Sequence, residues 1–426
     1  GGYEAWCVGG AVRDALLGQH HLDWDIATSA TPDQVRRTFR RTIPIGVEFG
    51  TVGVLDRTNV MHEVTTFRRD VETDGRHAVV KFGVSLEDDL ARRDFTINAI
   101  AWSPTRGQLF DPFDGAGDLE RGLLRTVGEA GMRMAEDRLR ALRAFRFAAR
   151  FGFSIDPETW SAVAASAKYL SRLSAERVKQ EIEKTMDQVS RPGTAFRMWM
   201  RSGALRELVP AISRASDLEL GFADFLAQPR LPNRPARRIN RITALLLPAG
   251  KHAHDTLRAL RFSNSDVAWV SGQVERWQST LPDLEASLGR TGTVPPAALR
   301  RWISSVGRMR APALLRVAVA VWCARQDAGD EVIALRHARA LYGRVVRSSF
   351  RDPLELGDLK VDGDDLREAG VPPGPRLGKL LNTLLGHVLE DPSLNDRDKL
   401  MALSRQLSSE TNDGGRRKSG SGDGKR

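Results

Sequence analysis

Short strand patterns and short helical patterns alternate over the first 125 residues of the chain. Runs of apolar and β-branched residues predict strands at residues 4–8, 23–28, 50–56 and 59–67. Between the first two strands, residues 11–17 predict a helix that ends at Gly18. This alternation predicts an α/β domain, the head, over residues 1–125.

Two further helices of the head have recognisable beginnings. Thr31 stands before Pro32, which is an N-cap followed by proline at the first helical position. Ser85 and Asp88 have the spacing of a capping box. We expect the helix that they open to run to about Trp102.

Strand patterns are absent from about Leu119 onward. Helical patterns with Arg on one face and Leu, Phe or Ala on the other predominate there. This change predicts all-α domains behind the head, and the last residues are rich in Gly, Ser, Lys and Arg, a composition typical of disorder. The expected order is a neck at 126–185, a body at 186–290, a tail at 291–408 and a disordered basic end at 409–426.

Chain length and net charge indicate the number of domains and the kind of partner that the protein suits. A chain of 426 residues is too long for one ordinary core, so several domains are expected. The formal charge of +10 suits a polyanionic partner but does not identify one. The most apolar stretch, from Leu314 to Ala324, contains Arg316 and is too short to cross a membrane. We therefore expect no membrane association, and no obligate protein partner is evident.

The two cysteines and the first residues bear on the compartment. Cys7 and Cys323 stand far apart in apolar surroundings, and we expect reduced thiols of a cytoplasmic protein. No signal-peptide pattern opens the chain. It begins with Gly1 rather than with Met, which predicts that a further piece precedes this residue.

The first candidate for chemistry is the pair Asp23 and Asp25 on a predicted strand. Residues i and i+2 of a strand point to the same face, so the two carboxylates converge. Mg²⁺ prefers hard oxygen ligands that it shares between carboxylates and phosphates. Two such ions can activate an attacking 3′-hydroxyl and stabilise a pyrophosphate leaving group. Taken alone, this spacing is more typical of a solvated strand edge than of a metal site.

The segment before this pair changes that balance. Gly9 and Gly10 lie between a predicted strand and a predicted helix, where they allow close backbone approach. The free N–H groups of a helix N-terminus bind phosphate, and Arg13 can reach the same group from one turn further on. Joined to the two carboxylates, this turn predicts a site for a triphosphate and metal ions.

Seven short segments carry a combined pattern. They are Gly-Gly-Ala-Val-Arg-Asp (9–14), Asp-Trp-Asp-Ile-Ala-Thr-Ser (23–29), Glu-Val-Thr-Thr-Phe-Arg (63–68), Asp-Gly-Arg-His (74–77), Arg-Arg-Asp-Phe-Thr-Ile-Asn-Ala (92–99), Asp-Pro-Phe-Asp-Gly (111–115) and Glu-Asp-Arg-Leu-Arg-Ala-Leu-Arg-Ala-Phe-Arg-Phe (136–147). In this order they resemble the motifs of the class II nucleotidyltransferases, the bacterial tRNA nucleotidyltransferases and their poly(A) polymerase relatives. The resemblance implies a polymerase-β-like palm in the head.

The resemblance also implies roles for the head residues. Asp23 and Asp25 would be the catalytic ligands of two Mg²⁺ ions. The incoming nucleotide would be bound by Gly9, Gly10, Arg13 and Arg93. Glu63 could supply a third carboxylate from a neighbouring strand, and an ordinary ion pair across the strands explains it equally well.

Base choice would belong to the neck. Asp137, Arg140, Arg143 and Arg146 recur every three residues, and by spacing alone they fit a salt-bridged helix surface. In the family that the chain resembles, the Asp and the first Arg of this motif act as a template for the base, and we assign all four residues to nucleotide binding. A carboxylate accepts from the amino group of C or A, whereas U and G present a carbonyl oxygen there.

The expected reaction is the addition of C, C and A from CTP and ATP to the 3′ end of tRNA, whose acceptor arm the basic helices would hold. Poly(A) synthesis is the alternative within the same family. Residues 45–52 resemble the segment common in CCA-adding enzymes. The Gly/Pro-rich residues 366–378 resemble the tail of longer CCA-adding enzymes and would expose N–H groups to an RNA phosphate.

The sequence leaves two alternatives open. Ala78 stands where the family commonly has proline after the Arg-His pair at 76–77, in a loop that is expected to be flexible. This departure leaves open a partial enzyme that adds only CC or only A. A second alternative is an RNA-binding module without activity, and the paired carboxylates at Asp23 and Asp25 argue against it, because binding alone needs no metal ligands.

Overall fold

The computed structural model describes the chain in five stretches, residues 1–19, 24–73, 78–226, 235–330 and 335–416. The backbone alone is described within these stretches for 70–73, 78–80, 235–236, 290–291, 335 and 409–416. The chain divides into two compact units. The first holds residues 1–238 with 255–263, and the second holds 239–254 with 264–426.

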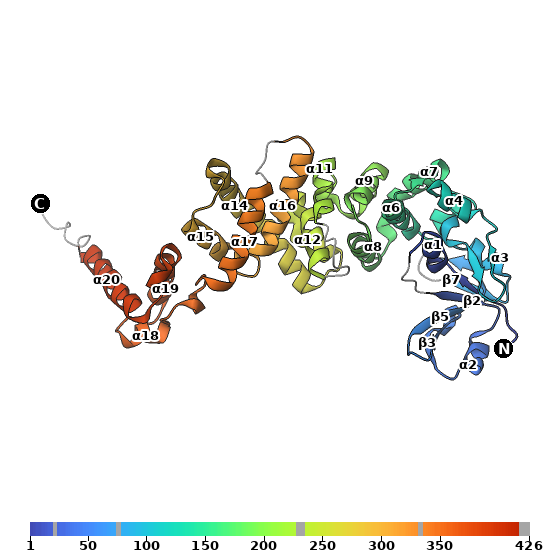
Figure 1. The fold of residues 1–426 in the computed structure, drawn as a ribbon, viewed down its shortest axis with the longest axis horizontal. Helices are drawn as coiled ribbons and strands as arrows, with labels where there is room; N and C mark the ends of the chain where they lie inside the picture. The colour runs from blue at the N-terminus through green and yellow to red at the C-terminus, as the bar shows by residue number, and fades with distance from the viewer. Residues whose placement is uncertain (20–23, 74–77, 227–234, 331–334, 417–426) are drawn as a thin grey trace, which may run out of the picture. The chain divides into compact units, whose positions relative to one another are not determined.

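A seven-stranded mixed sheet forms the head of the first unit (Figure 1). Its order is β3-β4-β5-β2-β1-β8-β9, and β2 runs parallel to β5 while all other neighbours are antiparallel. The strands are β1 (Ala5–Val8), β2 (Asp25–Thr28), β3 (Thr42–Gly46), β4 (Thr51–Leu55), β5 (Met61–Thr66), β8 (Ala101–Ser103) and β9 (Gln108–Phe110). A separate pair, β6 (Arg68–Thr73) and β7 (Ala78–Phe82), borders the predicted flexible loop, whose residues 74–77 lie outside the described part.

Four helices accompany the sheet, and α2 shows how they are held. The helices are α1 (Gly10–Leu16), α2 (Pro32–Thr38), α3 (Leu86–Ala91) and α4 (Gly115–Arg121). The predicted start of α2 is confirmed, because Thr31 and Gln34 form a reciprocal capping box. Val35 of α2 packs on the valines of β4 and β5, which buries one face of this half of the sheet. On the other side, Ile43 and Met61 stay exposed.

The helix predicted from Ser85 to Trp102 is wrong beyond Ala91. The backbone after α3 pairs with a later segment, with Phe95 bridged to Thr126, and only a short 3₁₀ turn η2 (Thr96–Asn98) follows. This pairing buries Phe95 completely. A long-range contact thus overrides the local helical pattern.

Helices make up the remainder of the first unit, as the sequence predicts. They are α5 (Ala130–Glu136), α6 (Leu139–Phe151), α7 (Pro157–Ser166), η3 (Ala167–Arg172), α8 (Ala175–Gln188), α9 (Gly193–Ser202), α10 (Ala204–Leu208), η4 (Pro210–Ile212), α11 (Asp217–Leu220) and η5 (Phe222–Phe225). Two short parallel strands, β10 (Leu123–Leu124) and β11 (Ser154–Ile155), were not predicted.

The second unit is helical throughout its described residues. Its α-helices are α14 (Asn264–Thr291), α15 (Pro296–Val306), α16 (Ala311–Asp327), α17 (Leu335–Arg351), α18 (Gly363–Glu368), α19 (Pro375–Glu390) and α20 (Arg397–Arg416). Its 3₁₀ turns are η6 (Leu247–His252), η7 (Leu356–Asp358) and η8 (Pro392–Leu394). Two further helices, α12 (Pro235–Leu246) and α13 (Ala253–Ala259), have residues in both units. The apolar stretch at Leu314 lies in α16 and is part of a hydrophobic core with Trp302 and Trp322. In the described part of the chain, no helix combines the length and apolarity that a membrane span needs.

These observations confirm an α/β head followed by helices. The inner boundaries of neck, body and tail stay predictions. The helix α20 continues to Arg416, beyond the point where disorder was expected, and residues 417–426 lie outside the described part. Cys7 and Cys323 are free thiols, and burial raises the pKa of both.

Candidate functional site

The turn between β1 and α1 brings three of the predicted site residues together. Gly9 has φ 73° and ψ −136°, a conformation that favours glycine. A Cβ added at Gly9 would lie 2.8 Å from Nη1 of Arg93 and 3.9 Å from Oδ2 of Asp25. Gly9 therefore creates the space in which the guanidinium and the carboxylate approach the start of α1.

Asp25 is the exposed first residue of β2 and lies opposite Val8 of β1. The parallel register sets Ile26 opposite Val64, so the preceding residues Asp25 and Glu63 are neighbours on the same face of the sheet. The structure thus adds Glu63 as a carboxylate beside Asp25. Asp23 lies outside the described residues, and among the described residues no group of three potential metal ligands occurs.

Arg93 is positioned by the segment that follows α3. Its Nη2 forms an ion pair with Asp89 at 3.2 Å, and its Nη1 donates to the carbonyl oxygen of Asn98 at 3.5 Å. Its buried Nε has no hydrogen-bond partner, and burial lowers the pKa of Arg93. An arginine N–H that lacks a partner is suited to a phosphate oxygen.

Arg13 is buried beside the turn, where a Cβ added at Gly10 would lie 3.4 Å from its Nη2. Its side chain is only 5% exposed, Nε donates to Asp14 at 2.7 Å, and Nη1 donates to Asn98. Its guanidinium also lies over the rings of Phe147 and Phe151, at 5.2 and 4.8 Å. Burial lowers the pKa of Arg13. These contacts join α1 to η2 and α6, so the arrangement favours a positioning role for Arg13.

Two arginines dock α6 against the segment that holds Arg93. Nη2 of Arg140 donates to the carbonyl oxygen of Arg92 at 2.9 Å. Arg143 forms a two-point ion pair with Asp94, at 2.8 and 2.6 Å. Burial opposes ionisation of Asp94, but the Arg143 charge and the hydrogen bonds outweigh it and hold its pKa below the usual range.

Asp137 ends α5 and is held by a residue that the sequence did not indicate. Both of its carboxylate oxygens accept from Nη2 of Arg177 in α8, at 2.9 and 2.7 Å. Oδ1 also accepts from the backbone N–H of Leu139 at 3.0 Å. Arg177 lies 40 residues further along the chain, and no local motif marks it.

Arg146 has a different setting from Arg140 and Arg143. It is 4% exposed, and its Nε donates to Glu181 at 2.7 Å while Nη1 donates to Gln188 at 3.1 Å. These contacts tie α6 to α8. Its assignment to nucleotide binding stays a prediction, and the structure favours a packing role.

Direct contacts therefore connect the two halves of the predicted site. Asp25 and Arg93 both lie beside Gly9, and Arg140 binds the carbonyl oxygen of the residue before Arg93. Asp137 lies at the start of the same helix, α6. The arrangement can bind a triphosphate at the turn while it presents fixed hydrogen-bonding groups to a base.

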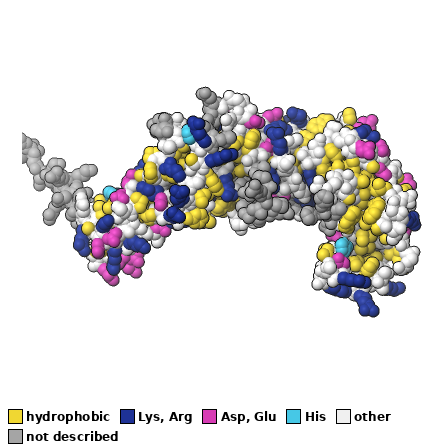
Figure 2. Space-filling view, viewed as in Figure 1, with side chains coloured by type: hydrophobic (Ala, Val, Ile, Leu, Met, Phe, Trp, Pro, Cys, Tyr) yellow, Lys and Arg dark blue, Asp and Glu magenta, His cyan; other side chains and the backbone are white. Residues whose placement is uncertain are grey.

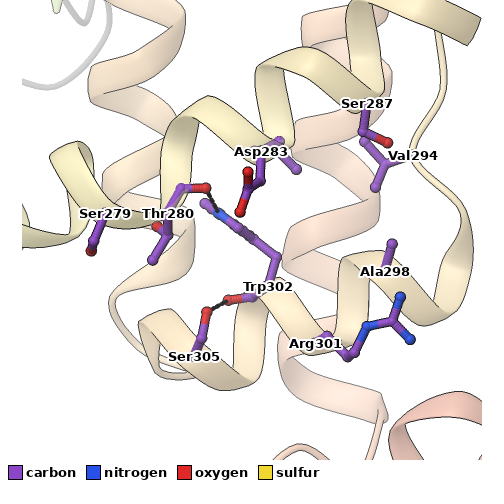
Figure 3. A pocket seen from close by; sticks show the side chains of 10 residues that line it. Ser279, Thr280, Asp283, Ser287, Val294, Ala298, Arg301, Trp302 and Ser305 are labelled. Carbon is purple, nitrogen blue, oxygen red and sulfur yellow. Dashed lines mark hydrogen bonds between the residues drawn. The ribbon is translucent and has the colours of Figure 1, made fainter.

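The second unit contains a pocket of about 410 Å³ between α14 and α15 (Figure 3). Its wall includes Trp302, whose Nε1 donates to the carbonyl oxygen of Thr280 at 3.2 Å. Asp283 and Arg301 are its charged residues, and Arg301 is paired with Glu390. No residue that the sequence assigned to the site lies here.

The predicted RNA-binding loop of the tail joins α18 to α19. The helix α19 begins after Gly374, at φ 124°, without a side-chain cap. Asn395 binds the backbone of Asp358 and Lys360, and Arg397 pairs with Asp365. These contacts fix the loop's surroundings, and its role in RNA binding stays a prediction.

Comparisons with known protein families match two segments of the chain. Residues 5–125 match the poly A polymerase head domain. Residues 152–216 match the family described as probable RNA and SrmB-binding site of polymerase A.

Individual relatives extend the similarity to nearly the whole chain. A CCA-adding enzyme of Limosilactobacillus fermentum is 33% identical over 420 residues, 95% of this chain and 94% of the relative. A CCA-adding enzyme of Geobacillus thermodenitrificans is 50% identical over 187 residues, 43% of this chain and 46% of the relative. The crystal structure of the Bacillus stearothermophilus CCA-adding enzyme in complex with CTP is 30% identical, with a TM-score of 0.75, and covers 96% of this chain and 95% of that one.

Proposed function

Because the chain belongs to the class II tRNA nucleotidyltransferases, the family of the CCA-adding enzymes, we propose that it adds C, C and A to the 3′ end of tRNA. The substrates are CTP and ATP, and pyrophosphate is released at each step. The observation that carries this proposal is that Asp25 and Arg93 both lie beside Gly9, and that the segment holding Arg93 is bonded to the helix that presents Asp137 and Arg140.

In the proposed reaction the head binds the triphosphate and the metal ions. The N–H groups at the start of α1 and the Nε of Arg93 bind phosphate oxygens. Asp23 and Asp25 would hold Mg²⁺, and Glu63 is a third candidate ligand because it neighbours Asp25 on the same face. When bound, two Mg²⁺ ions supply the Lewis acidity that in-line attack of a 3′-hydroxyl on the α-phosphate requires.

The α5–α6 junction selects the base. The carboxylate of Asp137 accepts from the amino group of C or A, and Arg140 donates to the adjacent ring nitrogen. Arg177 holds that carboxylate by two hydrogen bonds, which fix it in place. U and G would direct a carbonyl oxygen at the carboxylate, and two acceptors that face each other repel.

Full CCA addition is favoured over poly(A) synthesis by the relatives. The relative from L. fermentum carries the CCA-adding name and aligns over more than nine-tenths of both chains. Addition of CC alone or A alone remains the alternative, because Ala78 follows the Arg-His pair at 76–77, which lies outside the described residues.

The direct test is extension of a tRNA transcript that lacks its CCA end, with Mg²⁺ and CTP, ATP or both. Products are sized at single-nucleotide resolution beside an unrelated RNA. We expect two added residues with CTP alone and a stop after C, C and A with both nucleotides, on tRNA only. Long A tracts on either RNA would establish a poly(A) polymerase instead, and a stop after CC with both nucleotides would establish a partial enzyme.

A further inference from the structure

Three cationic side chains surround one aromatic ring beside the α5–α6 junction. The guanidinium carbons of Arg138 and Arg172 lie 4.6 and 5.1 Å from the ring centre of Tyr169, and Nζ of Lys168 lies 5.0 Å from it. Arg138 starts α6, and the other residues belong to η3. We call these four residues the Tyr169 patch.

The charges of the Tyr169 patch are not neutralised within the described structure. None of its three cations forms an ion pair with a described carboxylate, and Arg138 donates only a long hydrogen bond, of 3.5 Å, to Ser166. The nearest carboxylate along the chain, Asp137, is already bound by Arg177. Three like charges around one ring repel each other, and the cation–π contacts offset part of this repulsion. An anion would remove the rest.

The position of the Tyr169 patch indicates which anion it serves. Arg138 and Arg140 are two residues apart on α6, which separates their directions by about 200°. Arg140 points to Arg92 in the head, so Arg138 points away from the segment that holds Arg93. The patch is therefore adjacent to Asp137 but on the side away from the proposed triphosphate site. Residues 168–172 also fall within the segment that matches a probable RNA-binding family.

We propose that the Tyr169 patch binds a backbone phosphate of the RNA substrate. Arg138 and Arg172 would donate to the phosphate oxygens, Lys168 would add charge, and Tyr169 would hold the cations in place. The identity of the RNA as tRNA rests on the proposed function, whereas the phosphate contact does not. The patch would thereby hold the strand whose end must reach Asp25, and it would act without regard to sequence.

The test uses the full chain with Lys168 and Arg172 both changed to alanine. The matched control is the double variant Arg37→Ala and Arg40→Ala, which removes two exposed cations at the end of α2, where Figure 2 shows a group of Lys and Arg side chains. Binding of tRNA without its CCA end is measured by fluorescence anisotropy at several salt concentrations. Circular dichroism shows whether each variant is folded.

We expect the Tyr169-patch variant to bind tRNA about tenfold more weakly near 0.1 M salt. The slope of the logarithm of the binding constant against the logarithm of the salt concentration should be smaller by about one to two, the change expected for one to two lost phosphate contacts. The KM for CTP should not change, and Tyr169→Phe should bind as the wild type does. Equal weakening in the control, or an increase confined to the KM for CTP, would overturn the proposal. Addition assays separate the two proposals. If the wild type adds CCA but the Tyr169-patch variant binds RNA as well as the wild type does, only the proposal for the patch is refuted. If the variant binds RNA more weakly but the wild type does not add CCA, only the proposed activity is refuted.

Discussion

The turn at Gly9 and the α5–α6 junction at Asp137 belong to the same unit but differ in how their polar groups are bonded. At the turn, Gly9 leaves space beside Asp25, and Nε of Arg93 has no hydrogen-bond partner. At the junction, Asp137 is bound twice by Arg177, and Arg140 is bound to two backbone carbonyls. A site for a charged ligand must keep bonding capacity for it, whereas discrimination between bases requires groups that are fixed in advance.

The largest effect is expected at the turn, from Asp25→Ala. Loss of a metal-binding carboxylate should reduce nucleotide incorporation about a thousandfold or more, the scale seen when a group that stabilises developing charge is removed. tRNA binding should not change, because the patch and the helices remain intact. Incorporation of labelled CTP and tRNA anisotropy measure the two quantities. Retained incorporation in this variant would show that Asp25 and the turn beside it take no part in the chemistry.

Asp94→Asn tests how firmly the junction is attached to the head. The variant breaks the two-point pair with Arg143, so we expect a loss of about 3 kcal/mol in unfolding free energy. The pKa of Asp94 is depressed, so its contribution is complete above the unfolded pKa of about 3.9 and declines as pH falls through the folded value. The difference between wild type and variant should therefore shrink as pH is lowered below about 4. Urea unfolding at several pH values measures it.

The control for this variant is Asp33→Asn, which removes a carboxylate that is 75% exposed and 3.9 Å from Arg36. Such exposed pairs contribute little, so its unfolding free energy should stay near that of the wild type. An equal loss in both variants would mean that the Arg143 pair does not attach α6 to the head.

Arg177→Met tests whether Asp137 must be fixed to select the base. Two charge-assisted hydrogen bonds to Asp137 are lost, and we expect the preference for CTP over UTP to fall roughly tenfold, about 1.5 kcal/mol. Ratios of kcat/KM for the two nucleotides measure it. Lys184→Ala in the same helix, whose partner is Glu181, should keep the wild-type ratio, and an unchanged ratio in both variants would show that Arg177 only stabilises the fold.

Gly9→Ala gives the smallest of these effects and separates backbone strain from contact with Arg93. The new Cβ would meet Nη1 of Arg93 at 2.8 Å, and the end of that side chain can shift, so we expect the KM for CTP to rise about fivefold. Gly18→Ala has the same φ of 73° but no atom within 4 Å of its Cβ. It should lower stability while leaving the KM for CTP unchanged; a rise in both variants would point to strain alone.

Structural features that depend on residues close together in the chain were predictable from the sequence. Features that depend on contacts between residues distant in the chain were not. The N-cap at Thr31 and the Gly9 turn depend on residues close in the chain, and the sequence predicts both. The end of α3 depends on the pairing of Phe95 with Thr126, and the position of the Asp137 carboxylate depends on its hydrogen bonds from Arg177. Local sequence patterns carry no signal for either contact. Periodicity also cannot tell that Arg146 is buried against Glu181 while its neighbours in the motif face the head.

Catalysis at the Gly9 turn and base selection at the α5–α6 junction are tested most directly by the variant Asp137→Ala. The measurement is its preference for CTP over UTP on tRNA that lacks its CCA end. If the junction selects and the turn catalyses, this variant will still incorporate nucleotide while its preference for CTP falls by about tenfold or more. If it loses incorporation of both nucleotides equally and keeps its preference, Asp137 serves the chemistry or the fold and does not select the base.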